Sequence, residues 1–199
     1  MSETTPAPSP PEPKQRVGLV IVNTGDGKGK TTAALGLAFR ALGHGMKVFM
    51  IQYIKGKWKT GEGLLARRLA PEFEIRPMGD GFTWDTKDPA QDIATTAKIW
   101  EFSKEIIASG RYDMVILDEI NVVMKLGYLD PRPVVEFLQA RDPRLHVVLT
   151  GRGAPAEIVE LGDVVSEVRM VKHPFKPDPS RPHKPSRTEG VKAQRGIEF

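Results

Sequence analysis

The 199-residue sequence contains no cysteine. This absence excludes disulfide bonds, thiolate metal sites and a cysteine nucleophile, and it fits a reducing compartment. No apolar run approaches the roughly eighteen residues that cross a bilayer, and the proline-rich N-terminus lacks the apolar region of a secretory signal. We therefore expect no membrane segment and a cytoplasmic location.

Metal-ligand spacing is missing among the histidines. The chain has four of them, scattered at His44, His146, His173 and His183, without the intervals that are typical of metal sites. His146 lies inside an apolar run, where a hydrogen-bonded core histidine is the simpler explanation. We assign no catalytic role to any histidine.

A basic excess is concentrated at one end of the chain. The formal net charge is +4, yet residues 17–168 carry 19 basic and 20 acidic side chains, whereas residues 169–199 carry 8 basic and 3 acidic ones. A basic tail suits any polyanion. Nucleotide phosphates or a carboxylate-bearing ligand therefore fit as well as RNA.

The composition divides the chain into one domain and two tails. Residues 1–16 hold five prolines and no apolar period, which predicts a flexible arm. The chain as a whole is 40% hydrophobic, and residues 17–171 are long enough to bury one substantial core. Residues 172–199 return to proline and basic residues, and we expect an extended basic tail that caps the active site.

Strand-like and helix-like segments alternate through the domain. Apolar runs predict strands near 17–22, 47–53, 73–76, 111–117, 145–150 and 163–170. Helical spacing and end signals predict helices near 33–42, 62–69, 88–109, 131–139 and 154–161. On the first helix, the residues at core spacing are Ala34, Leu35, Ala38, Phe39 and Leu42. This alternation predicts a three-layer α/β domain of the P-loop NTPase (RecA-like) class, with a mainly parallel sheet and ligands at the carboxyl ends of its strands.

A glycine-rich turn, residues 23–32, joins the first predicted strand to the first helix. Its glycines, Gly25, Gly27 and Gly29, lack Cβ atoms, so their N–H groups can converge on an anion. Lys30 adds a positive charge, and Thr31 offers a hydroxyl to a phosphate-bound Mg²⁺. The turn is therefore interpreted as a phosphate cradle.

The cradle departs from the usual P-loop pattern at one position. Gly29, Lys30 and Thr31 fit G-x-x-x-x-G-K-[ST], but Thr24 stands where the first glycine is expected. A chance glycine- and lysine-rich turn is the alternative. The order of strand, loop and helix favours the cradle.

Two adjacent carboxylates, Asp118 and Glu119, follow the fourth predicted strand. This is the Walker B arrangement. If that strand adjoins the P-loop strand, either carboxylate can hold or orient Mg²⁺ opposite Thr31. Taken alone, an Asp-Glu pair after a strand could simply be two solvated turn residues. Because this pair follows a later strand of the same βα alternation that contains the P-loop, the metal role is favoured.

Separate motifs occur in one order along the chain, at residues 23–34, 81–84, 117–121, 149–152 and 190–199. Together they resemble the P-loop-type ATP:corrinoid adenosyltransferases, and the resemblance covers residues 17–199. That family moves the 5′-deoxyadenosyl group of ATP to the cobalt of a reduced corrinoid and releases triphosphate, in adenosylcobalamin biosynthesis or salvage. The resemblance implies ATP as co-substrate together with Mg²⁺.

The resemblance also implies site residues. The triphosphate-binding set is Asn23, Thr24, Gly25, Gly27, Lys28, Gly29, Lys30, Thr31 and Thr32. Thr31 and Glu119 would hold Mg²⁺, with Asp118 as a further candidate ligand. The implied catalytic residues are Lys30, Thr31, Arg40 and Glu119. ATP in this family lies in the reverse of the usual P-loop orientation, which presents carbon for attack, and Thr24 is interpreted as part of that difference.

Two aromatics, Phe82 and Trp84, match family residues that fill the lower face of the corrinoid and keep an axial ligand off the cobalt. Removing that ligand would bring reduction to the +1 state within range of a flavin donor. The residues alone favour core side chains that pin a loop, and only the resemblance favours the corrinoid role. Arg40 could likewise be a solvated helix residue.

The implied partners are a reduced corrinoid and a flavin-dependent reductant, and similar proteins form homodimers. Because cobalt is the nucleophile, no side-chain nucleophile or general base is required. One alternative is a P-loop ATPase or kinase that cleaves a phosphoanhydride, which its products would distinguish. Another is a nucleotide-dependent nucleic-acid-binding protein that uses the basic tail, or Lys55, Lys57 and Lys59 around Trp58. We expect neither nucleic acid nor a membrane to be the partner.

Overall fold

The computed structural model describes residues 17–56, 59–79, 89–172 and 196–197. The predicted N-terminal arm, the loop with Phe82 and Trp84, and most of the C-terminal tail lie outside these residues, so the domain boundaries stay a prediction. Within the described residues, no helix has the length and apolar character needed to cross a membrane.

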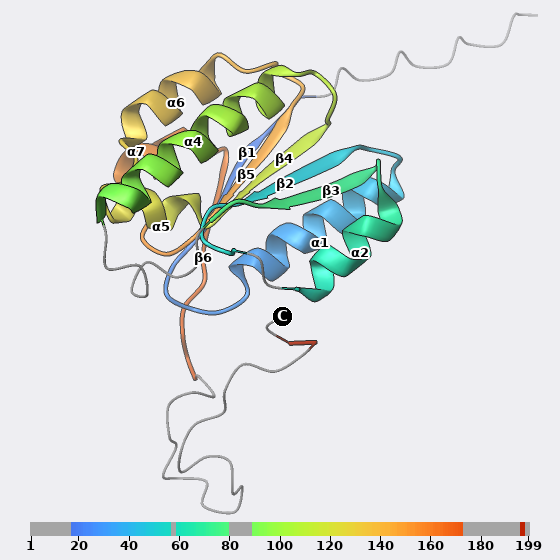
Figure 1. The fold of residues 1–199 in the computed structure, drawn as a ribbon, viewed down its shortest axis with the longest axis horizontal. Helices are drawn as coiled ribbons and strands as arrows, with labels where there is room; N and C mark the ends of the chain where they lie inside the picture. Colours follow the sequence, from blue (N-terminus) through green and yellow to red (C-terminus); the bar gives the residue numbers. More distant parts are fainter. Residues whose placement is uncertain (1–16, 57–58, 80–88, 173–195, 198–199) are drawn as a thin grey trace, which may run out of the picture.

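A single parallel sheet of six strands forms the centre of the fold (Figure 1). The strands are β1 (Val20–Thr24), β2 (Val48–Gln52), β3 (Phe73–Pro77), β4 (Met114–Asp118), β5 (His146–Thr150) and β6 (Val164–Glu167). Their spatial order is β3-β2-β4-β5-β1-β6. The predicted parallel α/β class is confirmed.

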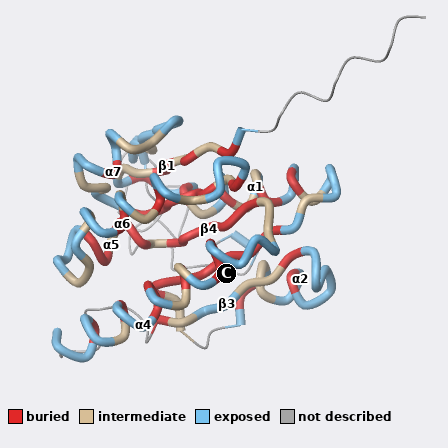
Figure 2. Tube along the Cα trace, turned by 90° about the horizontal axis from the view of Figure 1, so that it is seen from above, coloured by how far each residue is buried: buried red, intermediate tan, exposed pale blue. Residues whose placement is uncertain are grey.

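Helices cover both faces of the sheet. They are α1 (Lys30–Gly43), α2 (Gly61–Leu69), α4 (Pro89–Ala108), α5 (Ile120–Lys125), α6 (Pro131–Gln139) and α7 (Ala156–Leu161). The first two lie on one face and the other four on the opposite face (Figure 1). The central strands β2 and β4 are buried along their whole length for this reason, and Figure 2 shows the buried positions between the helical layers.

Small residues bring α1 close to the sheet. Ala34, Ala38 and Ala41 form its buried stripe. The expected inward position of Phe39 is wrong, because this side chain is 79% exposed. Successive helical residues point about 100° apart, so burying Ala38 turns Phe39 away from the sheet.

The strand order corrects another expectation. Strand β4 does not adjoin β1, because β5 pairs with both and separates them. Two strand spacings, roughly 10 Å, therefore lie between the P-loop strand and the Walker B strand. The short helix α5 directly after β4 was also not predicted from the sequence.

The final predicted elements are shorter than expected. The helix expected from residue 154 begins at Ala156, after Pro155 at its N-cap. The last strand ends at Glu167 instead of residue 170, and all four of its residues are exposed. Among the described strands, only β1 pairs with this one, which therefore lies at an edge of the sheet.

Candidate active site

The carboxyl ends of β1, β4 and β5 bring the predicted site residues to one edge of the sheet. Asn23 of β1 is in register with Thr150 of β5, and Leu117 of β4 is in register with Leu149. Asp118 and Glu119 therefore reach the same edge as the glycine-rich turn. The intervening strand contributes Thr150 between them.

Asp118 is a fully buried hydrogen-bond acceptor. Its Oδ1 accepts from the hydroxyls of Thr31 and Thr150, each at 2.8 Å, and its Oδ2 accepts from Gln52 Nε2 at 3.3 Å. Because the Thr31 proton is directed at Asp118, the lone pairs of that hydroxyl are left for another partner. Asp118 thus orients the threonine that the P-loop pattern assigns to Mg²⁺.

Glu119 has a backbone conformation that is rare for its residue type. Its φ of 65° lies in the left-handed region, where it is the only non-glycine among the described residues. Its N–H donates to Thr150 Oγ1 at 3.0 Å. A strained backbone that places a carboxylate at a sheet edge is typical of functional sites.

Charged neighbours act on the Glu119 carboxyl from several elements. Burial raises its pKa and the Asp118 carboxylate raises it further, whereas three cations oppose this shift: Lys30, Lys55 and Arg152. The described residues contain no cluster of three or more acidic or histidine side chains that could hold a metal alone. A cation here would instead use Thr31, Glu119, water and phosphate oxygens, which is the kind of donor set that Mg²⁺ takes.

Lys30 closes over its own loop. Its Nζ donates to the carbonyl oxygens of Gly25 at 2.8 Å and Gly27 at 2.6 Å, and the residue is only 6% exposed. Burial lowers the pKa of Lys30; Glu119 opposes this change and the Arg152 guanidinium adds to it. The lysine lies within the cradle, where phosphate oxygens could replace these carbonyls as partners.

Glycines shape the cradle for two reasons. Gly25 and Gly29 have φ values of 90° and 114°, which other residues rarely adopt. Gly27 instead makes room for the chain after β6: a Cβ there would lie 2.8 Å from the Val168 carbonyl oxygen. The Gly27 N–H donates to that oxygen at 2.7 Å, so in this structure it does not face an anion as expected.

The remaining predicted residues differ in position. Asn23 is buried, and its Nδ2 lacks a hydrogen-bond partner within the described chain. Lys28 and Thr32 are exposed at the cradle. Arg40 is exposed on α1, ten residues after Lys30. Because an α-helix rises about 1.5 Å per residue, Arg40 lies about 15 Å along the helix from Lys30. The structure therefore does not bring it to the cradle. Phe82 and Trp84 lie outside the described residues.

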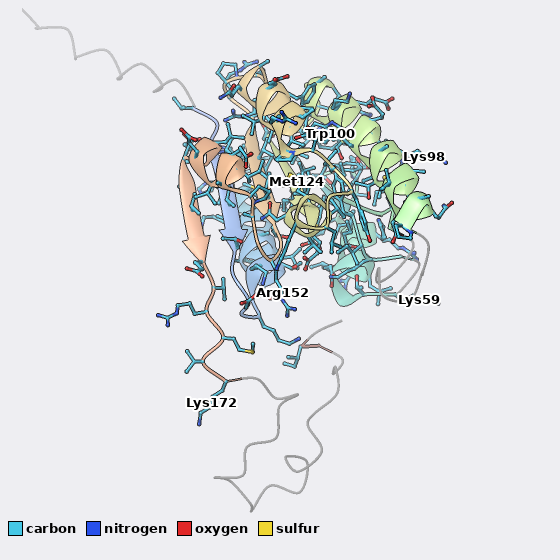
Figure 3. All side chains as sticks on the ribbon, turned by 90° about the vertical axis from the view of Figure 1, so that its left-hand side faces the viewer. Lys59, Lys98, Trp100, Met124, Arg152 and Lys172 are labelled. Atoms are coloured by element: carbon cyan, nitrogen blue, oxygen red, sulfur yellow. The ribbon has the colours of Figure 1, made fainter. Side chains whose placement is uncertain are left out.

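Sequence reasoning did not assign several residues that the structure places here. Thr150 and Gln52 bind Asp118, and Arg152 lies at the end of the sheet toward which the strands point (Figure 3). Lys55 pairs with Glu62 at 3.0 Å after β2. A polar side chain immediately after a buried strand was the available signal, because the carboxyl ends of parallel strands share one edge.

Comparisons with known proteins agree over nearly the whole chain. The sequence model of the family "ATP:corrinoid adenosyltransferase BtuR/CobO/CobP" matches residues 16–199. A corrinoid adenosyltransferase from Sinorhizobium sp. is 44% identical over 184 residues, which cover 92% of this chain and 80% of that protein. One from Pseudomonas aeruginosa is 43% identical over 182 residues, which cover 92% of this chain and 84% of that protein. The Escherichia coli K12 corrinoid adenosyltransferase is 44% identical over 182 residues, which cover 92% of this chain and 86% of that protein.

Solved structures support the fold alone. The flagellar accessory protein FlaH from Methanocaldococcus jannaschii superimposes with a TM-score of 0.50 at 13% sequence identity. The match covers 76% of this chain and 71% of that one.

Proposed function

Because the chain belongs to the ATP:corrinoid adenosyltransferase family, we propose that the carboxyl edge of its sheet holds ATP for attack at C5′. As a member of this family the protein is a transferase: it moves the 5′-deoxyadenosyl group of ATP to the cobalt of a reduced corrinoid and releases triphosphate. This activity belongs to adenosylcobalamin biosynthesis.

The observation that supports this site most is the Thr31–Asp118–Thr150 network beside Lys30. In the transfer, the electron pair of the reduced cobalt forms the cobalt–carbon bond, the C5′–O bond breaks, and the triphosphate leaves with its electron pair. Charge therefore develops on the leaving group. We assign the stabilisation of that charge to Lys30 and to the N-terminus of α1, which follows the glycine-rich turn.

We place Mg²⁺ at Thr31 and Glu119, where the donor types fit. Bound there, the ion would neutralise part of the triphosphate charge. Asp118 contributes by orienting the Thr31 hydroxyl, since its own oxygens already accept three hydrogen bonds. It is thus a weaker candidate for direct coordination than the sequence alone indicated.

The protein's other task is to hold the reactants in line. Cobalt supplies the nucleophile, so positioning C5′ and excluding competing ligands replace acid–base chemistry. Phe82 and Trp84 are proposed for the lower corrinoid face, and Arg40 for contact with the substrates. A flavin-dependent reductant, a homodimer, a cytoplasmic location and a capping role for residues 172–199 remain proposals that rest on the family resemblance.

Transfer and phosphoanhydride cleavage are separated by their products. Under anaerobic conditions, protein, ATP, Mg²⁺ and chemically reduced cobalamin should give the visible spectrum of the cobalt–carbon product and an equal amount of triphosphate. ADP with phosphate, or ATP consumption independent of the corrinoid, would instead identify an ATPase. No observation in the described residues favours the nucleic-acid-binding alternative.

A further inference from the structure

Thr24 binds the loop that follows β5. Its Oγ1 accepts from the Ala154 N–H at 3.0 Å, and the carbonyl oxygen of the neighbouring Asn23 accepts from the Gly151 N–H at 3.2 Å. The two residues that open the cradle therefore hold both ends of residues 151–154. A glycine at position 24, as in the usual P-loop pattern, has no hydroxyl for this contact.

The same loop is shaped to present Arg152. Gly151 and Gly153 on either side have φ values of 131° and 66°, and a Cβ on Gly151 would lie 3.0 Å from the Val122 backbone nitrogen. Asn121 Nδ2 also donates to the Gly151 carbonyl oxygen at 3.4 Å. The backbone around Arg152 is thus fixed by β1 on one side and α5 on the other.

The Arg152 side chain is exposed at the sheet edge (Figure 3). Within the described chain, no carboxylate forms an ion pair with it. Thr150, two residues before Arg152, accepts the Glu119 N–H at 3.0 Å, so Arg152 lies near Glu119. Its charge lowers the pKa values of both Glu119 and Lys30. Two neighbouring cations repel each other until an anion lies between them, and a guanidinium suits phosphate oxygens because it can donate two parallel hydrogen bonds.

We propose that Arg152 is a second cationic ligand of the triphosphate leaving group, beside Lys30, and that Thr24 is its positioning residue. The proposal rests on the proposed function for the identity of the leaving group. As the C5′–O bond breaks and the triphosphate takes the electron pair, Arg152 offsets the developing negative charge. The departure of Thr24 from the P-loop pattern then has a defined role.

The first test is binding of inorganic triphosphate with Mg²⁺, measured by titration calorimetry. Arg152→Gln should weaken binding about 10- to 100-fold, as expected for a charge-assisted hydrogen bond, and Arg152→Lys should weaken it less. Binding of adenosine, which has no phosphate, should not change. Arg144→Gln removes the same charge at the opposite end of β5 and is the matched control. Triphosphate binding by Arg152→Gln within twofold of wild type would overturn the proposal.

The second test separates positioning by Thr24 from a general structural role. Thr24→Val removes the acceptor while keeping the shape, and it should weaken triphosphate binding; Thr24→Ser should restore it. In the double variant with Arg152→Gln, the loss should be smaller than the product of the two single losses, because both act through one contact. Fully multiplicative losses would show that Thr24 does not act through Arg152.

Failure of the proposed function can be distinguished from failure of this inference. Triphosphate binding needs no corrinoid, so a wild-type protein that forms no cobalt–carbon product could still lose triphosphate binding on Arg152→Gln. In that outcome the transferase assignment fails and the phosphate role of Arg152 stands. If the wild-type protein forms the cobalt–carbon product but triphosphate binding is unchanged in Arg152→Gln, the transferase assignment stands and the phosphate role of Arg152 fails. A wild-type protein that does not bind triphosphate overturns the inference.

Discussion

At the scale of single residues, Asp118 combines full burial with three incoming hydrogen bonds. Asp118→Asn keeps the Oδ1 acceptor, and its new amide can donate to Gln52 Oε1, which lacks a partner among the described residues, once the Gln52 amide turns over. We expect its free energy of unfolding to fall by no more than about 1 kcal/mol. Asp118→Ala leaves three donors without this acceptor, two of them on the buried residues Gln52 and Thr150, and should cost at least about 2 kcal/mol. Denaturant unfolding of both variants tests this, and equal losses would contradict it.

Glu119 gives a prediction about pH. Burial raises its pKa above the ordinary 4.5, so the folded state binds this proton more tightly than the unfolded state. The wild-type protein therefore loses stability as pH rises from about 4.5 through the raised pKa, and the loss persists at neutral pH. Glu119→Gln should have a higher melting temperature than wild type at pH 7 without ligand, and the difference should shrink toward pH 4. A variant that melts lower than wild type at pH 7 would contradict this.

The residues of this site were predicted from sequence to different degrees. Four of them could be predicted because they belong to motifs that are recognised by residue type and spacing along the chain: Lys30, Thr31, Asp118 and Glu119. Thr150 and Arg152 acquire their roles only because β5 lies between β1 and β4. Apolar runs indicate that strands exist, but a run such as residues 146–150 fits any central place in a parallel sheet.

At the scale of elements, Arg141 joins three segments at the edge opposite the active site. Its guanidinium donates to the carbonyl oxygens of Leu138 at 2.9 Å, Leu145 at 3.2 Å and Gly18 at 3.0 Å. These bonds connect the end of α6 with the chain entering β5 and β1. An ammonium group lacks the planar fork that reaches all three acceptors.

Replacing the Arg141 guanidinium should lower the stability of the protein without changing its affinity for triphosphate. Arg141→Lys should lower the free energy of unfolding by about 1–3 kcal/mol and leave triphosphate affinity unchanged. Arg132→Lys is the control, because its exposed pair with Asp130 contributes about 1 kcal/mol or less. Equal stability of the two variants in a denaturant titration would show that the three bonds to Arg141 contribute little.

At the scale of the whole molecule, the cradle depends on a segment from the far end of the domain. Val168, just after β6, donates its N–H to the Thr24 carbonyl oxygen at 2.8 Å and accepts the Gly27 N–H at 2.7 Å. The sequence motifs did not predict this contact. It arises because β6 pairs with β1 at the edge of the sheet.

Gly27→Ala tests that dependence. The new Cβ would lie within 3 Å of backbone atoms of Val168 and Arg169, so the segment after β6 must shift. We expect faster amide hydrogen exchange at residues 27 and 168 and weaker ATP binding. Gly36→Ala on α1, where a Cβ meets no atom within 4 Å, is the control and should leave both unchanged. Unaltered exchange in Gly27→Ala would mean that the contact is not maintained in solution.

The pairing of β6 with β1 also has a consequence for protein synthesis. The first strand and the glycine-rich turn leave the ribosome early, but the backbone that completes the cradle is made only after the five other strands. A nascent chain that ends before residue 168 therefore carries the whole P-loop sequence without its finished shape. Since domains generally fold as units during synthesis, the protein acquires its affinity for nucleotide and its complete sheet in the same late step.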